Sequence, residues 1–376
     1  LDDYDKALAI YNRNQVYNDY GDITYQKVLE RLPCLIFEGP LPTYKGDKKT
    51  NKVYFTDLQE PGHSFSCENV QNDVQGTSSQ YYPRKNWKFK FKADITYTES
   101  GRTSPTYALR ADSIPVNAFC VKADFAESSG THNTGMAKVI NSLLIEMGLT
   151  TPPQKTNKEV RTTVDGYPIA IFHRETASDT LEFVGKYNFN NDKSTAETFG
   201  FSDGDESWEF SNNTSDRCLF KSADFSGTDW MNDFESRYPD DDAINAEYEA
   251  GTRKPEKLMV VTSWVVSTKD NLDKFNNEVR NHFNLDNLIA YYLITELFGM
   301  VDQRAKNMFL TYFHEEGKWI FIFYDNDTCF GLNNEGLIAF GYNIEYHDKI
   351  GTLNVWNGES SVLWNNLEKC FPSEIE

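Results

Sequence analysis

The sequence has no long apolar segment and comparatively little positive charge. Its longest apolar run, residues 288–301, is interrupted by Glu296 and is too short to cross a bilayer. Lys and Arg number 37 against 57 Asp and Glu, which gives a formal net charge of −20. An acidic surface repels phosphate backbones and anionic lipid, so we expect neither nucleic acid nor a membrane as partner. A nucleotide remains a candidate ligand, because its site needs only a few local cations and a metal ion.

Several common catalytic and metal-binding motifs are also missing. The six histidines are dispersed without an HExxH motif, and there is no GxSxG, Walker A or GxGxxG motif. The six cysteines form no CxxC pair, which argues against a zinc ribbon and a thioredoxin-like site. A chain of 376 residues can bury a core without disulfides, so we expect mostly free thiols. The opening residues are acidic and carry no signal-peptide pattern.

The chain changes in character along its length, and we expect three segments. They are a polar helical arm or linker over residues 1–31, a β-rich N-lobe over residues 32–175, and a helical C-lobe over residues 176–376. Within the third segment, residues 201–250 hold 14 Asp or Glu against 3 Lys or Arg. Such a charge run predicts a solvated insertion or surface loop. A calcium site is the sharper alternative, but these acids lack the ligand order of an EF-hand loop.

Local periodicity predicts several elements. Trp87, Phe89 and Phe91 alternate with lysines, which is typical of a strand that buries one face. A helix is expected from about residue 134 to 148. Residues 160–175 are expected to form a hairpin that turns at Asp165-Gly166.

The most informative pattern lies near the C-terminal end of the sequence. It begins with an apolar stretch at helical spacing, residues 285–298, and continues with a loop from Asp302 to Asn307. A hairpin follows over residues 308–323, and an Asp-x-Asp sequence, Asp325 to Asp327, comes directly after it. Helix, Asp-x4-Asn loop, hairpin and Asp follow one another in the same order in the catalytic lobe of protein kinases.

The chemistry of phosphoryl transfer explains that order. Asp302 would orient the attacking hydroxyl, Asn307 would bind a metal ion, and Asp325 would hold the metal that bridges the phosphates. The reaction needs mainly positioning and charge neutralisation, so a few groups suffice. The alternative from the residues alone is that Asp302 caps an element and residues 325–327 form a turn.

Four segments resemble the CotH family of atypical protein kinases. The family's Gly-x-Ser-Ser…Pro-Lys-Lys segment is similar to residues 75–79 with 83–90, and its Lys-Ala-x-Tyr-x-Asp…Asn segment is similar to residues 119–133. Its Asn-Gly…Tyr…Glu segment is similar to residues 165–175, and its Tyr…Asp…Asn…Trp-Asp-x-Asp…Phe-Gly segment is similar to residues 286–331. The last segment is the most specific, and the resemblance covers roughly residues 32–335. Two departures are Tyr324, where the family usually has Trp, and Pro168 to Ala170, which replace the usual Gly of the hairpin.

The resemblance implies an α+β, bilobal protein-kinase-like fold, with a β-rich N-lobe and a mainly helical C-lobe. It implies ATP and Mg²⁺ or Mn²⁺ as cofactors. By residue-for-residue matching, Asp302 and Asp325 are the catalytic acids, while Asn307, Asp325 and Asp327 are metal ligands. Arg304 and Lys306 add positive charge to the loop, where it would suit a phosphate.

The same resemblance assigns a nucleotide-binding set further upstream. Gly76, Ser78 and Ser79 stand where backbone N–H groups would approach the phosphates. Lys85 is the expected lysine for the α- and β-phosphates, with Lys122 as the alternative. For either lysine, a solvent-facing strand residue is the competing interpretation.

The expected activity is transfer of a phosphoryl group from ATP to a hydroxyl of a protein substrate. The alternative is a non-catalytic structural subunit that retains the kinase-like fold within a multi-subunit particle. CotH-like chains resemble components of spore coats, and similar chains are encoded by bacteriophages, so a spore coat or a virion is the location that the resemblance implies. The polar arm and the acidic segment suit such assembly partners.

Overall fold

The computed structural model describes residues 23–76, 79–125, 127, 129–130, 132–333, 336–337, 358 and 360–375. Their contacts divide the chain into two compact units. The first unit combines the chain up to Gly135 with Asp165–Thr198, and the second combines Met136–Val164 with the chain from Phe199 onward. The units are therefore interleaved in sequence, whereas the sequence predicts consecutive segments that meet after residue 175.

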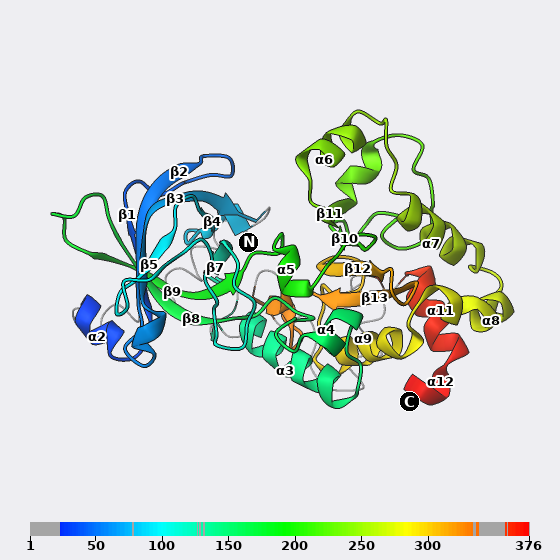
Figure 1. Cartoon of the computed structure of the whole chain (residues 1–376). Coiled ribbons are helices and arrows are strands. Elements are labelled where there is room, and N and C mark those ends of the chain that lie inside the picture. The colour runs from blue at the N-terminus through cyan, green and yellow to red at the C-terminus, as the bar shows by residue number, and fades with distance from the viewer. Residues whose placement is uncertain are drawn as a thin grey trace. The chain divides into compact units, whose positions relative to one another are not determined.

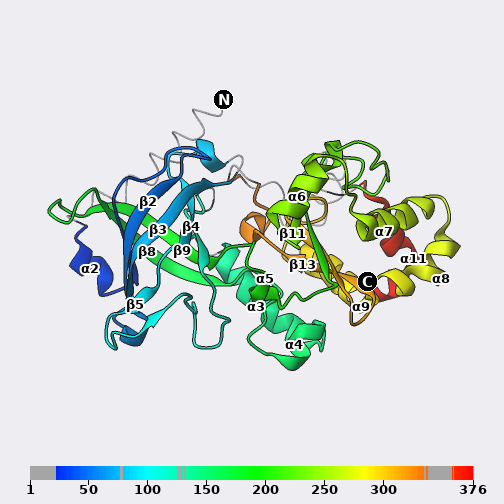
Figure 2. The same ribbon diagram turned by 45° about the horizontal axis from the view of Figure 1, so that its top comes forward.

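The first unit is built on strands β1 to β9 and one short helix. They are α2 (Tyr25–Leu29), β1 (Cys34–Glu38), β2 (Lys49–Thr56), β3 (Phe65–Gln75), β4 (Asn86–Phe91), β5 (Ile95–Tyr97), β6 (Thr103–Ser104), β7 (Ala118–Lys122), β8 (Gly166–Arg174) and β9 (Glu182–Asn191), with 3₁₀ turns at Pro61–His63 and Ser79–Tyr81. Seven of the strands follow the order β2-β1-β8-β9-β7-β4-β3, and β3 pairs again with β2. This second pairing closes the sheet into a barrel, whose strands curve around one another in Figures 1 and 2.

Aromatic side chains form the core of this barrel. Trp87, Phe89 and Phe91 are each at most 5 % exposed, which confirms the alternation predicted for β4. Phe89 stacks on Phe189 of β9 with ring centroids 5.8 Å apart. Each buried aromatic of this size contributes roughly 1.5–3 kcal/mol through the area it removes from water. The aromatic core therefore contributes substantially to the stability of this unit.

The predicted bilobal, protein-kinase-like fold is wrong. The strands of the first unit close into a seven-stranded barrel instead of forming a β-rich N-lobe. The second unit is not a mainly helical lobe, because it contains a four-stranded sheet of its own. Periodicity along the sequence indicates which residues form strands, but it does not indicate which strands pair. Here β1 pairs in parallel with β8, which follows it by more than a hundred residues.

The hairpin predicted over residues 160–175 is also wrong. Gly166 begins β8, which runs to Arg174 and pairs with β9, so the turn lies between Arg174 and Glu182. A Cβ atom on Gly166 would lie 2.4 Å from the carbonyl oxygen of Phe189. Glycine is therefore required here for the close approach of two backbones and not for a turn.

An ion pair between a buried carboxylate and a partly exposed lysine lies on the opposite face of the barrel wall from the aromatic core. The Asp192 carboxylate lies 3.1 Å from the Lys88 ammonium and accepts hydrogen bonds from Ser194 and from the thiol of Cys120. Burial disfavours its charge, but Lys88 and these hydrogen bonds hold the pKa of Asp192 below its ordinary value. Burial and the Asp192 charge together raise the pKa of the Cys120 thiol well above its ordinary value.

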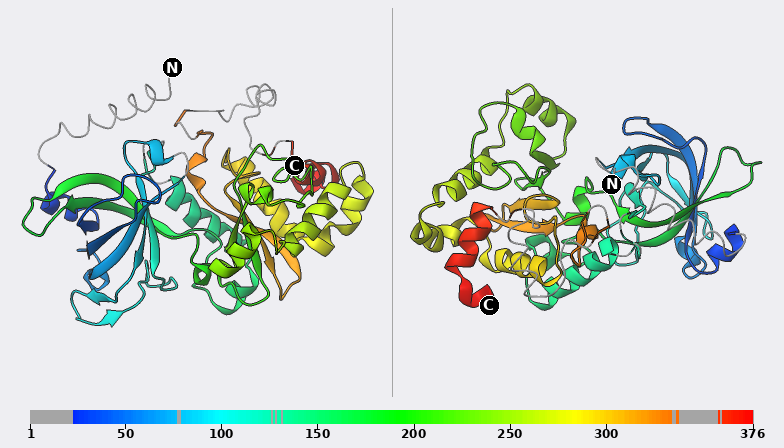
Figure 3. Two further views of the ribbon diagram at one scale, coloured as in Figure 1. Left: turned by 90° about the horizontal axis from the view of Figure 1, so that it is seen from above. Right: turned by 180° about the vertical axis from the view of Figure 1, so that it is seen from behind.

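The second unit combines a small antiparallel sheet with most of the helices. Its elements are α3 (His132–Glu146, which begins in the first unit), α4 (Pro152–Thr156), α5 (Ala196–Phe199, at the boundary), β10 (Glu206–Phe210), β11 (Phe234–Tyr238), α6 (Asp242–Glu249), α7 (Glu256–Ser267), α8 (Leu272–His282), α9 (Leu285–Leu297), β12 (Met308–Phe313), β13 (Lys318–Phe323), α11 (Val362–Cys370) and α12 (Pro372–Ile375), with 3₁₀ turns at Asp229–Asn232 and Asn326–Thr328 (η5). The strand order is β11-β10-β12-β13. Helix α11 lies beside α8, as both views of Figure 3 show.

The sheet of the second unit is covered on both faces. Leu310, Phe321 and Phe323 belong to the core formed with α7, α8, α9 and α11. Phe309 and Ile322 point to the other face, into a smaller cluster with Val164 and Phe199. Because alternate side chains point to opposite faces, burial of both faces explains why β12 and β13 are almost continuously apolar.

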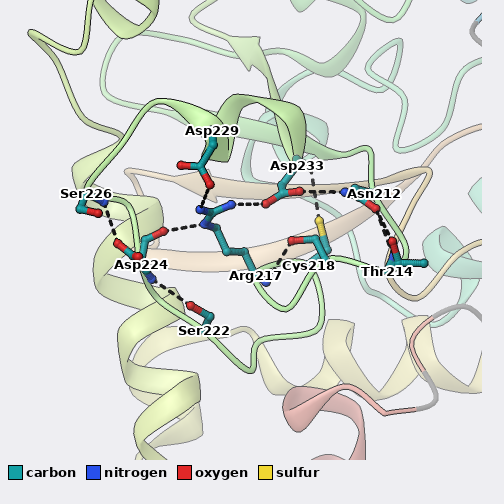
Figure 4. A network of polar contacts seen from close by, with 10 residues as sticks. Asn212, Thr214, Arg217, Cys218, Ser222, Asp224, Ser226, Asp229 and Asp233 are labelled. Carbon is teal, nitrogen blue, oxygen red and sulfur yellow. Dashed lines mark hydrogen bonds and ion pairs between the residues drawn. The ribbon is translucent and has the colours of Figure 1, made fainter.

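The acidic segment 201–250 is more structured than its composition indicates. It supplies β10, β11 and α6, and it buries large side chains such as Trp208 and Trp230 in the core of the second unit. Figure 4 shows how Arg217 organises it: the guanidinium lies 2.5 Å from both Asp229 and Asp233 and donates to the backbone oxygen of Asp224. Asp233 is thus a buried acceptor inside the unit, whereas Asp229 is paired but remains mostly exposed.

The helices and the thiols agree with the sequence analysis in most respects. Helix α9 and the hairpin of β12 and β13 lie where the sequence predicts them, and α3 begins two residues before the expected start. All six cysteines are free, as expected. No helix among the described residues is long and apolar enough to cross a membrane.

We expect Asp192→Asn to destabilise the chain in a pH-dependent way. At pH 7 the free energy of unfolding should fall by about 1–3 kcal/mol, towards the lower end because Lys88 is partly exposed and its charge is screened. The pKa of Asp192 is depressed in the folded state, so this contribution is present above about pH 4 and is lost as the pH falls further.

Urea titrations of the full chain at pH 7 and pH 3 would measure this difference. Asp94→Asn, at an exposed acid between β4 and β5, is the matched control and should change little. An equal loss of stability for Asp192→Asn at both pH values would contradict the assignment to the Asp192 charge.

Candidate functional site

The β12–β13 hairpin brings the predicted catalytic segments to one place. Met308 pairs with Phe323 at the open end of the hairpin, so Asn307 and Tyr324 leave the two strands side by side. The preceding helix, α9, is fixed to β13 through Asn287, whose side chain accepts from the N–H of Phe321 at 2.9 Å. The loop from Asp302 to Asn307 and the segment from Asp325 onward are therefore neighbours through strand pairing.

Asp302 and Asn307 contact each other directly. The Asn307 side-chain amide donates to the Asp302 carboxylate at 2.9 Å. Asp302 is only 2 % exposed, and the Lys306 ammonium lies 3.7 Å from the same carboxylate oxygen. Two residues that the sequence predicts to act together thus share a hydrogen bond, with one positive charge beside them.

Gln303 joins this loop to the segment of Asp325. Its side-chain amide donates to the backbone oxygens of Tyr324 and Asp325, at 2.8 and 3.1 Å. The Tyr291 hydroxyl on α9 in turn donates to the Gln303 backbone oxygen at 2.7 Å. Burial raises the pKa of Tyr291 well above its ordinary value, so this hydroxyl remains a donor at any physiological pH.

Two of the predicted site residues have strained backbones. Asn307 and Asp325 have φ values of 53° and 54°, in the left-handed region that non-glycine residues rarely adopt. Each such residue costs roughly 1–3 kcal/mol, and Asn and Asp tolerate it best. Strain of this kind persists only where the surroundings define the conformation, and it gathers at functional sites.

Arg304 does not offer its charge to a ligand, although the sequence suggests that role for it as well as for Lys306. Its guanidinium donates to Thr295 at 2.9 Å, forms an ion pair with Glu296 and stacks over the Tyr292 ring at 4.0 Å. At 5 % exposure it ties the loop to α9. Lys306, with 31 % of its side chain exposed, is the loop cation nearer to solvent.

The Asp-x-Asp segment follows directly on β13. Tyr324, which replaces the Trp usual in the resembled family, is buried and stacks on Phe309 with centroids 5.2 Å apart. An aromatic ring thus still anchors the backbone just before Asp325. Asp327 lies in the 3₁₀ turn η5 and is partly exposed.

The residue types predicted to bind the metal ion suit a hard divalent cation. Among the described residues, no three His, Cys, Asp or Glu side chains gather as a preformed metal site. Mg²⁺ is typically held by one or two carboxylates together with substrate phosphates, and it prefers oxygen ligands. Asp325 offers a carboxylate as a ligand. The Asn307 side-chain nitrogen donates to Asp302, which leaves the side-chain carbonyl oxygen of Asn307 able to serve as a metal ligand.

The predicted phosphate-binding residues lie in the first unit. Gly76 follows β3 with a φ of 104°, and a Cβ atom there would lie 2.0 Å from the Ser79 hydroxyl oxygen. Gly76 and Ser79 are therefore close together. Ser78 lies outside the described residues.

The two candidate lysines have different surroundings. The Lys85 ammonium donates to the backbone oxygens of Gln80 and Tyr82, at 2.6 and 2.9 Å. Burial lowers the pKa of Lys85. Lys122 is 3 % exposed at the end of β7, where it pairs across the sheet with Asn188 of β9. Neither lysine is the solvent-facing residue of the competing interpretation.

Two features of the site escaped the sequence analysis. Gln303 stands between the predicted catalytic residues, but nothing in the sequence shows that its side chain turns inward. In β9, Asn188 binds the Asp124 carboxylate and the backbone oxygen of Gly130, the latter at 2.7 Å. The alternation of Asn188 and Asn190 with Phe189 was a readable signal for a polar row on one face of a strand.

Comparison with known proteins supports the family expected from the sequence. Residues 188–369 match the family model described as CotH kinase protein. A search of curated proteins found no match. The matched range contains Asp302, Asn307, Asp325 and the whole sheet of the second unit, whereas Gly76, Lys85 and Lys122 precede it. The match to this family model, which contains the predicted catalytic segment, supports a CotH-type protein.

Proposed function

We propose that this chain transfers a phosphoryl group from ATP to a hydroxyl of a protein substrate, with Mg²⁺ or Mn²⁺. The family match supports kinase-like activity in general. The observation that carries the specific proposal is the hydrogen-bonded pair of Asp302 and Asn307, held beside Asp325 by Gln303 within the matched range. Phosphoryl transfer depends mainly on such positioning and on charge neutralisation.

Each residue has a separate role in this proposal. Asp302 accepts a hydrogen bond from the attacking hydroxyl and receives its proton as the new bond forms. Asn307 orients the Asp302 carboxylate, and together with Asp325 and Asp327 it would hold the metal ion. The bound cation would supply positive charge that neutralises the charge developing on the phosphates. Lys306 adds a positive charge beside Asp302.

The nucleotide side of the proposal involves residues outside the matched range. Backbone N–H groups around Gly76, Ser78 and Ser79 would approach the phosphates. Lys85 would exchange its two backbone acceptors for phosphate oxygens, or Lys122 would use its charge from the end of β7. Replacing each lysine by Met and comparing ATP-dependent stabilisation distinguishes these two assignments.

We expect Asp325→Asn to reduce metal-dependent phosphoryl transfer by at least about 100-fold, because it removes the main neutralising carboxylate. The fold should survive, since Asn tolerates the left-handed conformation of this position. Asp325→Ala should show the same kinetic loss and be about 1 kcal/mol less stable, because Ala tolerates that conformation poorly. Transfer of labelled phosphate and thermal unfolding measure the two effects.

Glu315→Gln is the matched control for these variants. Glu315 is an exposed acid in the turn at the far end of the same hairpin, so its loss should leave transfer unchanged. If Asp325→Asn retained wild-type transfer at every MgCl₂ and MnCl₂ concentration, Asp325 would not be the metal ligand.

We expect Asp302→Asn to lower the transfer rate by about 10²–10⁴-fold, because the general base is lost. Stabilisation by ATP with MgCl₂ or MnCl₂ should persist, since this residue acts on the acceptor side. A thermal-shift titration beside the transfer assay separates the two properties. If the wild type shows neither stabilisation by nucleotide nor transfer to any protein acceptor, the chain acts as a structural subunit instead.

A further inference from the structure

Gln303 joins the loop to two other segments of the chain through hydrogen bonds. It is 0 % exposed, and the two hydrogens of its side-chain amide reach two successive backbone oxygens, those of Tyr324 and Asp325. Its own backbone oxygen accepts from the Tyr291 hydroxyl at 2.7 Å. Tyr291 is itself fully buried and stacks on Phe323 with centroids 4.1 Å apart.

This arrangement coincides with the strained backbone of Asp325. The residue adopts φ 54° and ψ 62°, a left-handed conformation that needs support from its surroundings. The Gln303 amide supports it by binding the carbonyl oxygens on both sides of the Asp325 Cα atom. The direction of the Asp325 side chain is set by this backbone conformation, so Gln303 controls it without touching the carboxylate.

We propose that Gln303, held by Tyr291, is a positioning residue that fixes Asp325 for metal binding. The proposal rests on the proposed function, since it assumes that Asp325 holds the divalent cation. Residues that orient a metal ligand from behind typically change metal affinity or activity by about 10–100-fold when they are replaced. A residue that only contributes packing would lower stability and leave the metal requirement unchanged.

The chain provides a matched control for packing. Asn287 is another buried side-chain amide, 6 % exposed, that ties the same hairpin to α9. It bonds both the N–H and the oxygen of Phe321, four residues before Asp325. Gln303→Met and Asn287→Leu each replace a buried side-chain amide, which binds backbone groups of residues 321–325, by an apolar side chain of similar size.

The experiment compares both variants with the full-length wild type. With ATP and a protein acceptor, we expect Gln303→Met to raise the MnCl₂ concentration for half-maximal transfer by at least about tenfold. Asn287→Leu should leave it within about twofold, although both variants should lower the midpoint of thermal unfolding. Tyr291→Phe removes the support behind Gln303 and should shift the MnCl₂ requirement in the same direction by less. This milder variant tests the proposal if Gln303→Met does not fold.

Hydrogen exchange followed by mass spectrometry, without metal, provides a readout independent of catalysis. Peptides that cover residues 324–329 should exchange faster in Gln303→Met than in Asn287→Leu. Equal MnCl₂ requirements and equal exchange in the two variants would overturn the positioning role. If the wild type transfers no phosphate, the proposed function fails, and the exchange comparison alone then decides whether Gln303 holds Asp325.

Discussion

Burial of β12 and β13 on both faces is the constraint on which the candidate site depends. Side chains of the hairpin enter two separate apolar clusters, one on each face of the sheet. A shift of one residue in the strand pairing would turn each set of side chains to the opposite face, where it would not meet the residues it packs against. The register with Met308 opposite Phe323 is therefore strongly favoured. Once it is set, Asn307 and Tyr324 must emerge together, and Asp302 and Asp325 lie only a few residues further along the two segments.

Buried polar side chains then convert this proximity into a defined arrangement. Gln303, Arg304 and Asn287 each satisfy backbone groups or charges that the loop would otherwise bury without partners. An unsatisfied buried group costs about 1–3 kcal/mol, so each of these side chains favours one loop conformation over its alternatives. The left-handed backbones of Asn307 and Asp325 are held within this network.

The corrected fold and the proposed chemistry of this chain are separate questions. The family match covers residues 188–369, which include the sheet of the second unit and the Asp302 loop but little of the barrel. A closed seven-stranded barrel replaces the lobe that the resemblance implies. Function is carried by sites and not by whole folds, so the correction of the fold leaves the proposed roles of Asp302 and Asp325 open to test.

The sequence by itself determined the local elements and the order of the catalytic candidates. Helix α9, the hairpin and the alternation in β4 were predictable because side-chain periodicity reflects local geometry. Only the tertiary structure decided that β8 pairs with β1, that β3 closes the barrel by pairing with β2, that the acidic segment joins a core, and that Gln303 and Arg304 turn inward. These outcomes depend on strand pairing and on buried hydrogen bonds between residues far apart in the sequence. Side-chain periodicity reports only local geometry, so it does not predict such contacts.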